Sequence, residues 1–275
     1  MHLPIYVIAL DDSSRFTKLS TDLLIAELDF QKVTAINGKN LSESQVNDLA
    51  NLESCKSRIG TDITKSQIAC AMSHRNVYEL FEKSNLEWAL VLEEDVRLGV
   101  DFNHRLQNLL NDLNFRGPSV IQLFTRGERF VSQRRVQKFD SVQNVFKFAS
   151  TPGQTAAYLI NHDAAKKALA DPKIDGPADW PNWSASVNFY CVYPFLVSEN
   201  GSETTIQTGM SSTFQFRVRI FLIITGLHYL RYKKSYSSSS AYFSLVMRPI
   251  LRRLQWRVTG RRTYPSNDAS GLWLV

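Results

Sequence analysis

Near its amino end the chain reads Ile5-Tyr6-Val7-Ile8-Ala9-Leu10, an apolar, partly β-branched run that stops at Asp11. A continuous apolar run of this kind is typical of a strand buried on both faces. The residues Asp12, Ser13 and Ser14 can then cap a helix, and a second short strand is expected over 30–36, before the turn Asn37-Gly38. The apolar positions with helical spacing are Phe16, Leu19, Leu23, Leu24 and Leu28. The opening therefore predicts a β-α-β unit.

Two capping boxes predict the starts of the next helices. They are Ser42-Glu43-Ser44-Gln45 and Thr64-Lys65-Ser66-Gln67, in which a hydroxyl and a Gln three residues later satisfy free N–H groups. The helix after Thr64 should end near Asn85. The apolar run Trp88-Ala89-Leu90-Val91-Leu92 then predicts a strand that leads directly into Glu93-Glu94-Asp95.

The rest of the first 200 residues continues to alternate between strand and helix patterns. Helices are expected over about 102–113 and after Asn161, and strands over 120–124, 142–148 and 155–160. This alternation predicts an α/β fold, with a central sheet flanked by helices. Ligands in such sheets lie beyond the carboxyl ends of the strands. The loop after Leu10 and the acidic residues after Leu92 are therefore expected to share one cleft.

Composition divides the chain into an ordinary globular part and a basic tail. The 275 residues are 44% hydrophobic and 21% charged, with a formal net charge of +6. The segment from Thr204 to Asn267 contains 11 Lys or Arg and no acidic residue, which leaves 21 basic and 26 acidic residues elsewhere. We predict a globular domain over 1–209 and a basic, aromatic extension over 210–275.

Several classes of protein fit the sequence poorly. Cys55, Cys70 and Cys191 are odd in number and form no CxxC pair, which argues against a disulfide framework and a zinc site. The first apolar stretch lacks a basic leader and is not typical of a signal peptide. The longest apolar run, 220–230, is shorter than the ~20 residues of a membrane-spanning helix. These features favour a cytoplasmic protein.

Glu93 and Asp95 are candidate metal ligands. Side chains alternate along a strand, so these two carboxylates should project to one face and Glu94 to the other. Two carboxylates suit Mg²⁺ or Mn²⁺, which keep positions open for substrate phosphates and stabilise a departing diphosphate. Three acids at the end of a strand can equally belong to a solvated loop, although the five apolar residues before them weaken that alternative.

Asp179 is a candidate general base. It lies in Pro177-Ala178-Asp179-Trp180-Pro181, where the prolines restrict the backbone. A fixed carboxylate could take the proton from an acceptor hydroxyl, although an exposed loop acid is the simpler interpretation. His74 follows Ser73 on the predicted helix and, by itself, suggests only a packed histidine. The dinucleotide, Walker, HExxH and GxSxG motifs are absent, which argues against the common enzymes that carry them.

Several segments, taken in order, resemble glycosyltransferase family 25. They are Ile5 to Asp11, Ala35-Ile36-Asn37-Gly38-Lys39, Gln67 to His74, Leu90 to Val96, Thr155 to Ile160, Pro177 to Trp180 and Tyr193-Pro194. The resemblance covers most of the chain up to about Gly209. It implies a GT-A-like fold, which binds a nucleotide-sugar donor, usually UDP-galactose. The implied reaction is an inverting transfer onto a lipopolysaccharide or lipooligosaccharide acceptor, either a glycan or a lipid-linked oligosaccharide.

The resemblance also implies roles for individual residues. Glu93 and Asp95 would bind the Mn²⁺ or Mg²⁺ ion and the diphosphate, and Asp179 would act as the base. The implied donor contacts are Leu10, Asp11, Arg15, Asn37, Gly38, Lys39, Ser73, His74, Glu94 and Thr155. The family usually has Asn in place of Ala9 and Asp in place of Asn37 and Glu94. These departures bear on donor identity more than on reaction type.

The tail and two alternative functions complete the predictions. The segment 242–258 alternates apolar residues with Arg248, Arg252, Arg253 and Arg257, a basic amphipathic pattern that suits anionic lipid headgroups. We therefore expect peripheral attachment to the inner face of the cytoplasmic membrane. A tail that binds nucleic acid is an alternative, although no nucleic-acid partner is expected. A sugar nucleotidyltransferase is another, but the segment 11–15 lacks the glycine-rich phosphate loop typical of that class.

Overall fold

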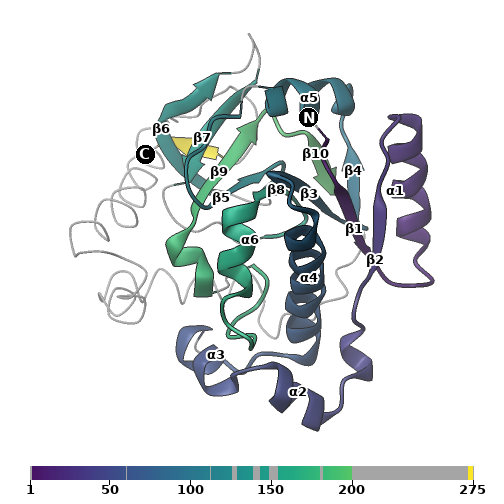
Figure 1. Ribbon diagram of the computed structural model, residues 1–275, viewed down its shortest axis with the longest axis vertical. Coiled ribbons are helices and arrows are strands. Elements are labelled where there is room, and N and C mark those ends of the chain that lie inside the picture. The colour runs from purple at the N-terminus through teal and green to yellow at the C-terminus, as the bar shows by residue number, and fades with distance from the viewer. Residues whose placement is uncertain are drawn as a thin grey trace, which may run out of the picture.

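The computed structural model describes residues 2–59, 61–111, 113–125, 129–138, 143–148, 154–179, 182–199 and 272–274. These residues form a mixed nine-stranded sheet with helices on both faces (Figure 1). In spatial order the strands are β11 (Leu272–Leu274), β6 (Arg129–Lys138), β7 (Asn144–Phe148), β9 (Asn188–Tyr193), β5 (Ser119–Gln122), β8 (Ala157–Asn161), β3 (Trp88–Glu93), β1 (Ile5–Ala9) and β2 (Gln31–Thr34). The predicted α/β class and mixed central sheet are confirmed.

The sheet edge that matters for function lies at the carboxyl ends of β1, β2 and β3. These three neighbouring strands are parallel, with Ile8 opposite both Val33 and Glu93. Strand β8 runs antiparallel to β3, which places its amino end at the same edge. A separate two-stranded sheet pairs β4 (Val96–Leu98) with β10 (Val197–Glu199). The chain segments after β1 and β3 and before β8 therefore meet at one edge.

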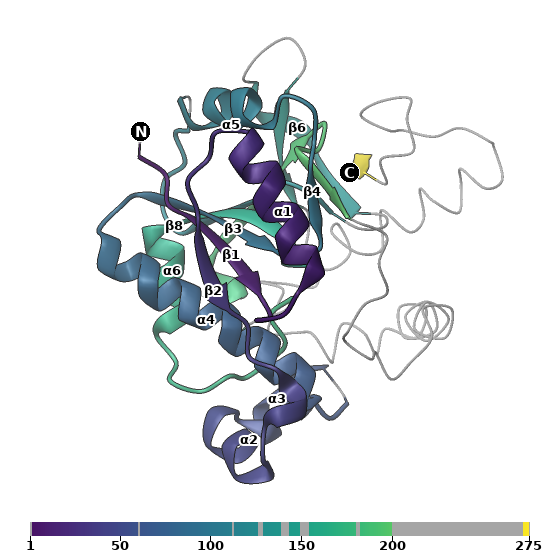
Figure 2. The ribbon, with the colours of Figure 1, turned by 90° about the vertical axis from the view of Figure 1, so that its right-hand side faces the viewer.

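Alternation along β1 and β3 assigns their residues to two hydrophobic layers. Ile5, Val7, Leu90 and Leu92 pack in the layer that includes buried leucines of α1 (Ser14–Ile25) and α5 (Phe102–Asn111). The intervening residues pack against α4 (Lys65–Ser84) and α6 (His162–Leu169). Figure 2 shows α1 on one side of the sheet and α4 with α6 on the other. Burial of both strand faces explains the continuous apolar runs.

Helix starts follow the capping predictions closely. Ser13 caps α1, and its hydroxyl accepts from the backbone N–H of Phe16. Both predicted capping boxes are present, one at the start of α2 (Glu43–Leu49) and one at the start of α4. Asn85 ends α4 in the left-handed conformation, and Asn161 caps α6. Local hydrogen bonding therefore sets these boundaries, as the sequence indicates.

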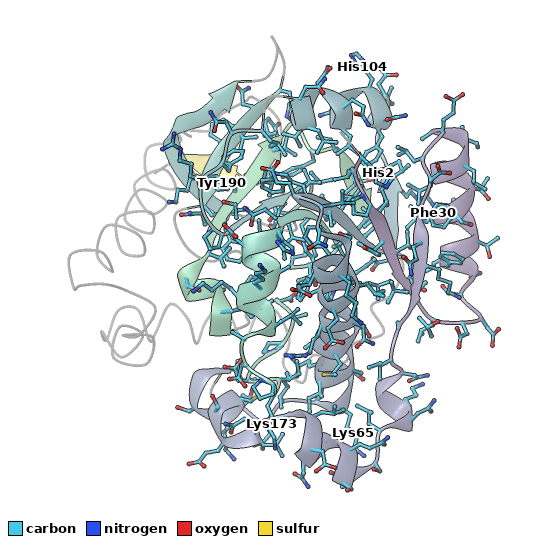
Figure 3. The ribbon with its side chains drawn as sticks, viewed as in Figure 1. His2, Phe30, Lys65, His104, Lys173 and Tyr190 are labelled. Carbon is cyan, nitrogen blue, oxygen red and sulfur yellow. The ribbon has the colours of Figure 1, made fainter. Side chains whose placement is uncertain are left out.

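The end of the molecule that carries α2 and α3 (Leu52–Ile59) is tied to the main body by lysines. Lys65 Nζ donates to the carbonyl of Leu41 at 2.9 Å, and Lys173 Nζ donates to that of Asn47 at 3.1 Å. Figure 3 shows both lysines near these helices. The isolated bridge between Ala50 and Ile174 adds a further link. The last two contacts place the loop after α6 beside the end of α2.

Several strands were not predicted. Strand β6 is mostly polar and basic and shows no regular apolar alternation, and β9 is a short, mostly apolar run that periodicity alone does not distinguish from a helix segment. Both are defined by pairing with strands distant in the sequence. The predicted extension over 210–275 lies outside the described residues except for 272–274. Among the described residues, every helix is too short or too polar to span a bilayer.

Gly38 provides a direct test of packing in this fold. It lies in the short 3-10 helix Gly38–Asn40, and a Cβ there would come within 2.6 Å of Ser66 Cα at the start of α4. We expect Gly38→Ala to lower the free energy of unfolding by about 1–3 kcal/mol, because backbone must move to admit the methyl group. Urea denaturation measures this, with exposed Lys39→Ala as control. Equal stability of the two variants would contradict the predicted clash.

Candidate functional site

Acidic side chains gather at the sheet edge where β1 and β3 end. We define the acidic corner as Glu93, Asp95, Asp179 and Glu199, which come from the end of β3, the turn after it, the loop before the 3-10 helix Asn182–Ser186, and the end of β10. Asp95 interacts electrostatically with Glu93 and Glu199. A single hydroxyl, Thr155 Oγ1, lies 2.7 Å from Glu93 and 3.4 Å from Asp179. Such a concentration of negative charge attracts cations.

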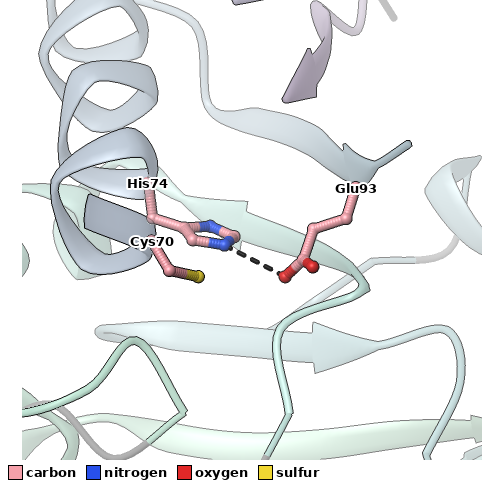
Figure 4. A group of neighbouring side chains, drawn as sticks. All are labelled: Cys70, His74 and Glu93. Carbon is pink, nitrogen blue, oxygen red and sulfur yellow. Dashed lines mark hydrogen bonds and ion pairs between the residues drawn. The ribbon is translucent and has the colours of Figure 1, made fainter. Parts of the chain in front are cut away.

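Glu93 is held by a hydrogen-bonded series of side chains that runs into the core. His74 Nε2 lies 3.2 Å from Glu93 Oε1, as Figure 4 shows, and His74 Nδ1 lies 2.8 Å from the Tyr158 hydroxyl. The Tyr158 hydroxyl in turn lies 2.9 Å from that of Tyr78. Burial raises the pKa of both tyrosines, so both phenols keep their protons. His74 is 2% exposed, which fixes its ring toward Glu93.

Asp95 carries the unpaired oxygen of the acidic corner. Its Oδ1 atom is buried and has no hydrogen-bond partner among the described residues. Burial, and then the charges of Glu93 and Glu199, raise the pKa of Asp95 from 3.8 to about 6, whereas Arg15 opposes the rise. A buried carboxylate oxygen without a donor is costly, so its retention points to a ligand that supplies positive charge. Together with Glu93 it offers the hard oxygen donors that Mg²⁺ and Mn²⁺ prefer.

Glu94 faces the opposite way from Glu93, as predicted from the sequence. Its two carboxylate oxygens accept from the backbone N–H of Leu10 and from the Arg15 guanidinium. Glu94 therefore joins the end of β1 to the start of α1. Because β3 ends at Glu93, both Glu94 and Asp95 lie in the turn, and the pleat sets the direction of neither side chain. The position of Asp95 is thus set by the turn and not by the pleat.

The other predicted donor contacts are placed in two groups. Ser73 is buried, where its hydroxyl accepts from the N–H of Ile36 and donates to the carbonyl of Ala69. Gly38 is buried against α4. Asp11, Asn37 and Lys39 are exposed, although Asp11 accepts from Thr34 and Asn37 caps the turn at Lys39. The buried residues shape the loops, and only the exposed ones present side chains to a ligand.

Asp179 lies within the same site as Glu93. It is exposed, and the Thr155 hydroxyl lies between the two carboxylates. A hydroxyl has one proton, which the shorter contact directs to Glu93. Trp180 and Pro181, which were expected to make this segment rigid, lie outside the described residues. The structure therefore brings Glu93, Asp95, His74, Thr155 and Asp179 together, and the Glu94 contact with Leu10 places the loop after β1 beside the end of β3.

Some residues of this site were not predicted. Cys70 lies one turn before His74 on α4, and the charges of Glu93, Asp179 and Asp95 add to burial in raising its thiol pKa. Gln154, whose φ of 103° is unusual for a residue with a side chain, donates to Glu199 at 2.7 Å. The i, i+4 spacing of Cys70 and His74 is visible in the sequence. Glu199 becomes adjacent only because β10 pairs with β4.

A cavity of about 310 Å³ lies behind the site, between α4 and α6. His74 and Tyr78 line it, together with Arg75 and Lys173. The two cations are engaged, since Arg75 donates to the carbonyls of Asp171 and Leu169, and Lys173 to that of Asn47. These contacts hold the loop after α6 in place. The acidic corner, and not this cavity, therefore carries the candidate chemistry.

We propose that the acidic corner binds a divalent cation, and such binding should depend on pH through Asp95. Because its pKa in the folded protein is about 6, Asp95 is charged above that pH and neutral below it. We expect Mn²⁺ affinity to fall by about tenfold between pH 7 and pH 5, as the proton competes with the ion. Calorimetric titration across this range measures it. An affinity that does not change between pH 7 and pH 5 would exclude Asp95 as a ligand.

Comparison with known proteins agrees with the geometry. Residues 2–174 match the sequence model described as glycosyltransferase family 25 (LPS biosynthesis protein). Procollagen galactosyltransferase 1-B of Xenopus laevis is 29% identical over 162 residues, which are 58% of this chain and 26% of that protein. A glycosyltransferase 25 family member of Anopheles gambiae is 28% identical over 177 residues, 62% of this chain and 29% of that protein.

One of the relatives carries a name that describes it as inactive. The protein named inactive glycosyltransferase 25 family member 3 of Mus musculus is 29% identical over 165 residues, 58% of this chain and 27% of its own length. The chain spans about a quarter of the length of the curated relatives it matches. The matched region includes Glu93 and Asp95 but ends before Asp179. The assignment of Asp179 to the acidic corner therefore rests on the structure of this chain and not on the family match.

Proposed function

The chain belongs to glycosyltransferase family 25, and from this premise we propose that it transfers a hexose from a nucleotide-diphosphate sugar to a glycan. Galactose from UDP-galactose is the proposed donor, a choice supported by the names of the galactosyltransferase relatives. A lipopolysaccharide or lipooligosaccharide is the proposed acceptor, a choice supported by the family description. The observation that carries the proposal is the buried, unpaired Asp95 oxygen within the acidic corner.

Asp95 and Glu93 would hold a divalent cation, Mn²⁺ or Mg²⁺. The donor set fits, because it consists of carboxylate oxygens, and one of them has no hydrogen-bond partner within the described part of the chain. When bound, such an ion neutralises the charge that develops on a departing diphosphate. The protein fixes the ligands in advance: His74 and Thr155 orient Glu93, and the turn between β3 and β4 positions Asp95. Pre-orientation reduces the cost of assembling the site.

Asp179 is the proposed general base. Its carboxylate is exposed and lies on the far side of Thr155 from Glu93. In this role it takes the proton from the acceptor hydroxyl as the oxygen attacks the anomeric carbon of the donor sugar. Attack on the side opposite the diphosphate inverts that carbon. The Thr155 hydroxyl makes its shorter contact with Glu93 and its longer one with Asp179.

The donor is proposed to lie across the carboxyl ends of β1 and β3. Glu94 shapes the loop that follows β1, since its carboxylate accepts from the backbone N–H of Leu10 and pairs with the Arg15 guanidinium. Exposed Asp11, Asn37 and Lys39 are then the side chains available to the nucleoside. The Asn37 side chain is neutral, and its Oδ1 atom already accepts from the backbone N–H of Lys39. A ribose contact there would therefore use the side-chain NH₂ group of Asn37 as a donor.

The basic extension is proposed to hold the enzyme at an anionic membrane surface on the cytoplasmic side. Surface residence raises the local concentration of a lipid-linked acceptor without new contacts in the active site. The proposal rests on the absence of acidic residues over 204–267 and on the amphipathic pattern within 242–258. Flotation with anionic liposomes tests it. Equal flotation of the full chain and a variant lacking residues 235–275 would contradict it.

The catalytic proposal is tested by incubating the protein with a panel of UDP-sugars and a lipooligosaccharide acceptor. UDP release and acceptor glycosylation are measured with Mn²⁺ and with a chelator. We expect one donor to be turned over only in the presence of metal. A sugar nucleotidyltransferase would instead consume a nucleoside triphosphate and a sugar phosphate. Absence of turnover, combined with absence of UDP-sugar binding, would overturn the proposal and group the chain with the inactive relatives.

A further inference from the structure

Three metal-binding side chains of different chemical types meet beside the acidic corner. The Cys70 thiol, the His74 imidazole and the Glu93 carboxylate each offer one ligand atom, and these atoms lie within 4.8 Å of one another. Figure 4 shows Cys70 and His74 projecting from α4 toward Glu93 at the end of β3. We propose that these three residues bind a borderline-soft divalent cation, with Zn²⁺ as the best match. This inference does not depend on the proposed transfer reaction.

The helix supplies two of the ligands by its regular geometry. Cys70 and His74 are at positions i and i+4 of α4, so they lie about one turn apart on the same face. The same i, i+4 relation lets two ligands on one helix bind zinc in other proteins. Glu93 supplies the third ligand from a rigid strand that is buried up to that residue. A rearrangement of the backbone is therefore not needed to bring the three together.

The distances are close to those of a filled site. Zinc bonds of about 2.0–2.3 Å in a tetrahedral arrangement place ligand atoms about 3.3–3.8 Å apart. His74 Nε2 and Glu93 Oε1 already meet this at 3.2 Å. The Cys70 side chain would move by about 1 Å, which a side-chain rotation can provide. Three protein ligands then leave a fourth position for water or substrate, as in zinc sites with an open coordination position.

The surroundings of His74 are those of an oriented ligand. Its Nδ1 atom lies 2.8 Å from the Tyr158 hydroxyl, which contacts Tyr78 behind it. A hydrogen bond to the second ring nitrogen fixes the tautomer and the ring direction of a zinc-bound histidine. Binding would replace the proton between His74 Nε2 and Glu93 and release the Cys70 thiol proton to solvent.

Ligand type separates this site from the one proposed at Asp95. A thiolate and an imidazole favour Zn²⁺, whereas carboxylate oxygens alone favour Mg²⁺ or Mn²⁺. Glu93 is common to both sets, so one ion draws it toward α4 and the other toward Asp95. Occupancy by Zn²⁺ should therefore weaken Mn²⁺ binding. This competition gives the site a measurable consequence for the neighbouring one.

The experiment uses Co²⁺ as a spectroscopic probe and Zn²⁺ as a competitor, with the full chain and no sugar donor. A thiolate ligand gives Co²⁺ a near-ultraviolet charge-transfer band, which we expect in the wild-type protein and in Cys55→Ser. Cys55 is a buried cysteine remote from this group, and its thiol contacts the carbonyl of Ile174. In Cys70→Ser the band should vanish, and Zn²⁺ should bind at least about tenfold more weakly.

A second variant protects the test from a folding defect. His74→Gln should keep the thiolate band at saturating Co²⁺ but bind Zn²⁺ at least about tenfold more weakly. Circular dichroism confirms that each variant is folded. A wild-type spectrum without the thiolate band, or a band that persists in Cys70→Ser, would overturn the proposal. Because no donor is present, this failure is distinct from a failure of glycosyl transfer.

Discussion

Asp95→Asn is expected to stabilise the protein while it abolishes glycosyl transfer. The Oδ1 atom of Asp95 is buried and finds no hydrogen-bond partner among the residues that the structure describes, and burial with two like charges raises the pKa of Asp95 to about 6. The difference from the ordinary value of 3.8 corresponds to at most about 3 kcal/mol at neutral pH. Partial exposure of the side chain reduces the expected gain to about 1–2 kcal/mol. The amide keeps the shape of the carboxylate and removes its charge.

The stability advantage of Asp95→Asn over the wild type should increase as the pH rises. A folded-state pKa above the unfolded value means that the folded protein binds the proton more tightly, so wild-type stability falls as pH rises from about 4 through 6. Asp95→Asn lacks this loss, and its advantage should grow over the same range and remain constant above it. Urea denaturation at about pH 4.5 and about pH 7.5 measures the difference in the free energy of unfolding between Asp95→Asn and the wild type.

The same variant should lose metal-dependent turnover by at least about a hundredfold, the usual effect of removing one electrostatic contact to a developing charge. Asp29→Asn is a matched control, because it removes an exposed carboxylate that precedes β2, at the opposite end of the parallel strands. A variant that is more stable and equally active would show that Asp95 is neither a metal ligand nor part of the site.

Asp179→Asn should abolish transfer by a different route. As the proposed base, Asp179 contacts the acceptor and not the metal, so its loss should lower kcat by about 10²–10⁴-fold. Binding of UDP with Mn²⁺ should be unchanged, since Glu93 and Asp95 remain. The variant should also keep its stability, because Asp179 is exposed and the Thr155 hydroxyl retains its shorter bond to Glu93.

Measuring kcat and UDP affinity together identifies this role. Thr155→Val provides a matched comparison, since it removes the hydroxyl between the two carboxylates but leaves both charges. It should change Mn²⁺ affinity more than Asp179→Asn does, because Thr155 orients Glu93. A loss of UDP binding in Asp179→Asn would contradict the base assignment and place Asp179 in the donor site.

Local signals predicted much of the fold. Helix starts at Ser13, Ser42, Thr64 and Asn161 depend on hydrogen bonds within a few residues, so the sequence pattern is enough to locate them. The strands β1 and β3 are recognisable because both faces are buried. Strand order is different, since it depends on pairing between distant segments. The antiparallel contact of β3 with β8 and the pairing of β4 with β10 could not be read from periodicity.

The candidate site was predicted in outline. The position of Glu93 at a strand end follows from the pattern and is present in the structure, whereas the proximity of Thr155 and Asp179 to Glu93 could not be read from periodicity. The sequence does not show which atoms are already used, and so Ser73 and Glu94 were expected at the donor although protein groups occupy their oxygens. The absence of a CxxC pair argued against a zinc site, and the i, i+4 spacing of Cys70 and His74 was therefore not recognised as a possible pair of metal ligands.

The central claim is that Asp95 and Glu93 bind a divalent cation that holds a nucleotide diphosphate. Calorimetric titration of UDP into the protein, with Mn²⁺ and with a chelator, tests it without any acceptor. We expect UDP to bind only with Mn²⁺ in the wild-type and Asp29→Asn proteins, and not at all in Asp95→Asn. Binding of UDP that is equally tight without metal, or that survives in Asp95→Asn, would contradict it.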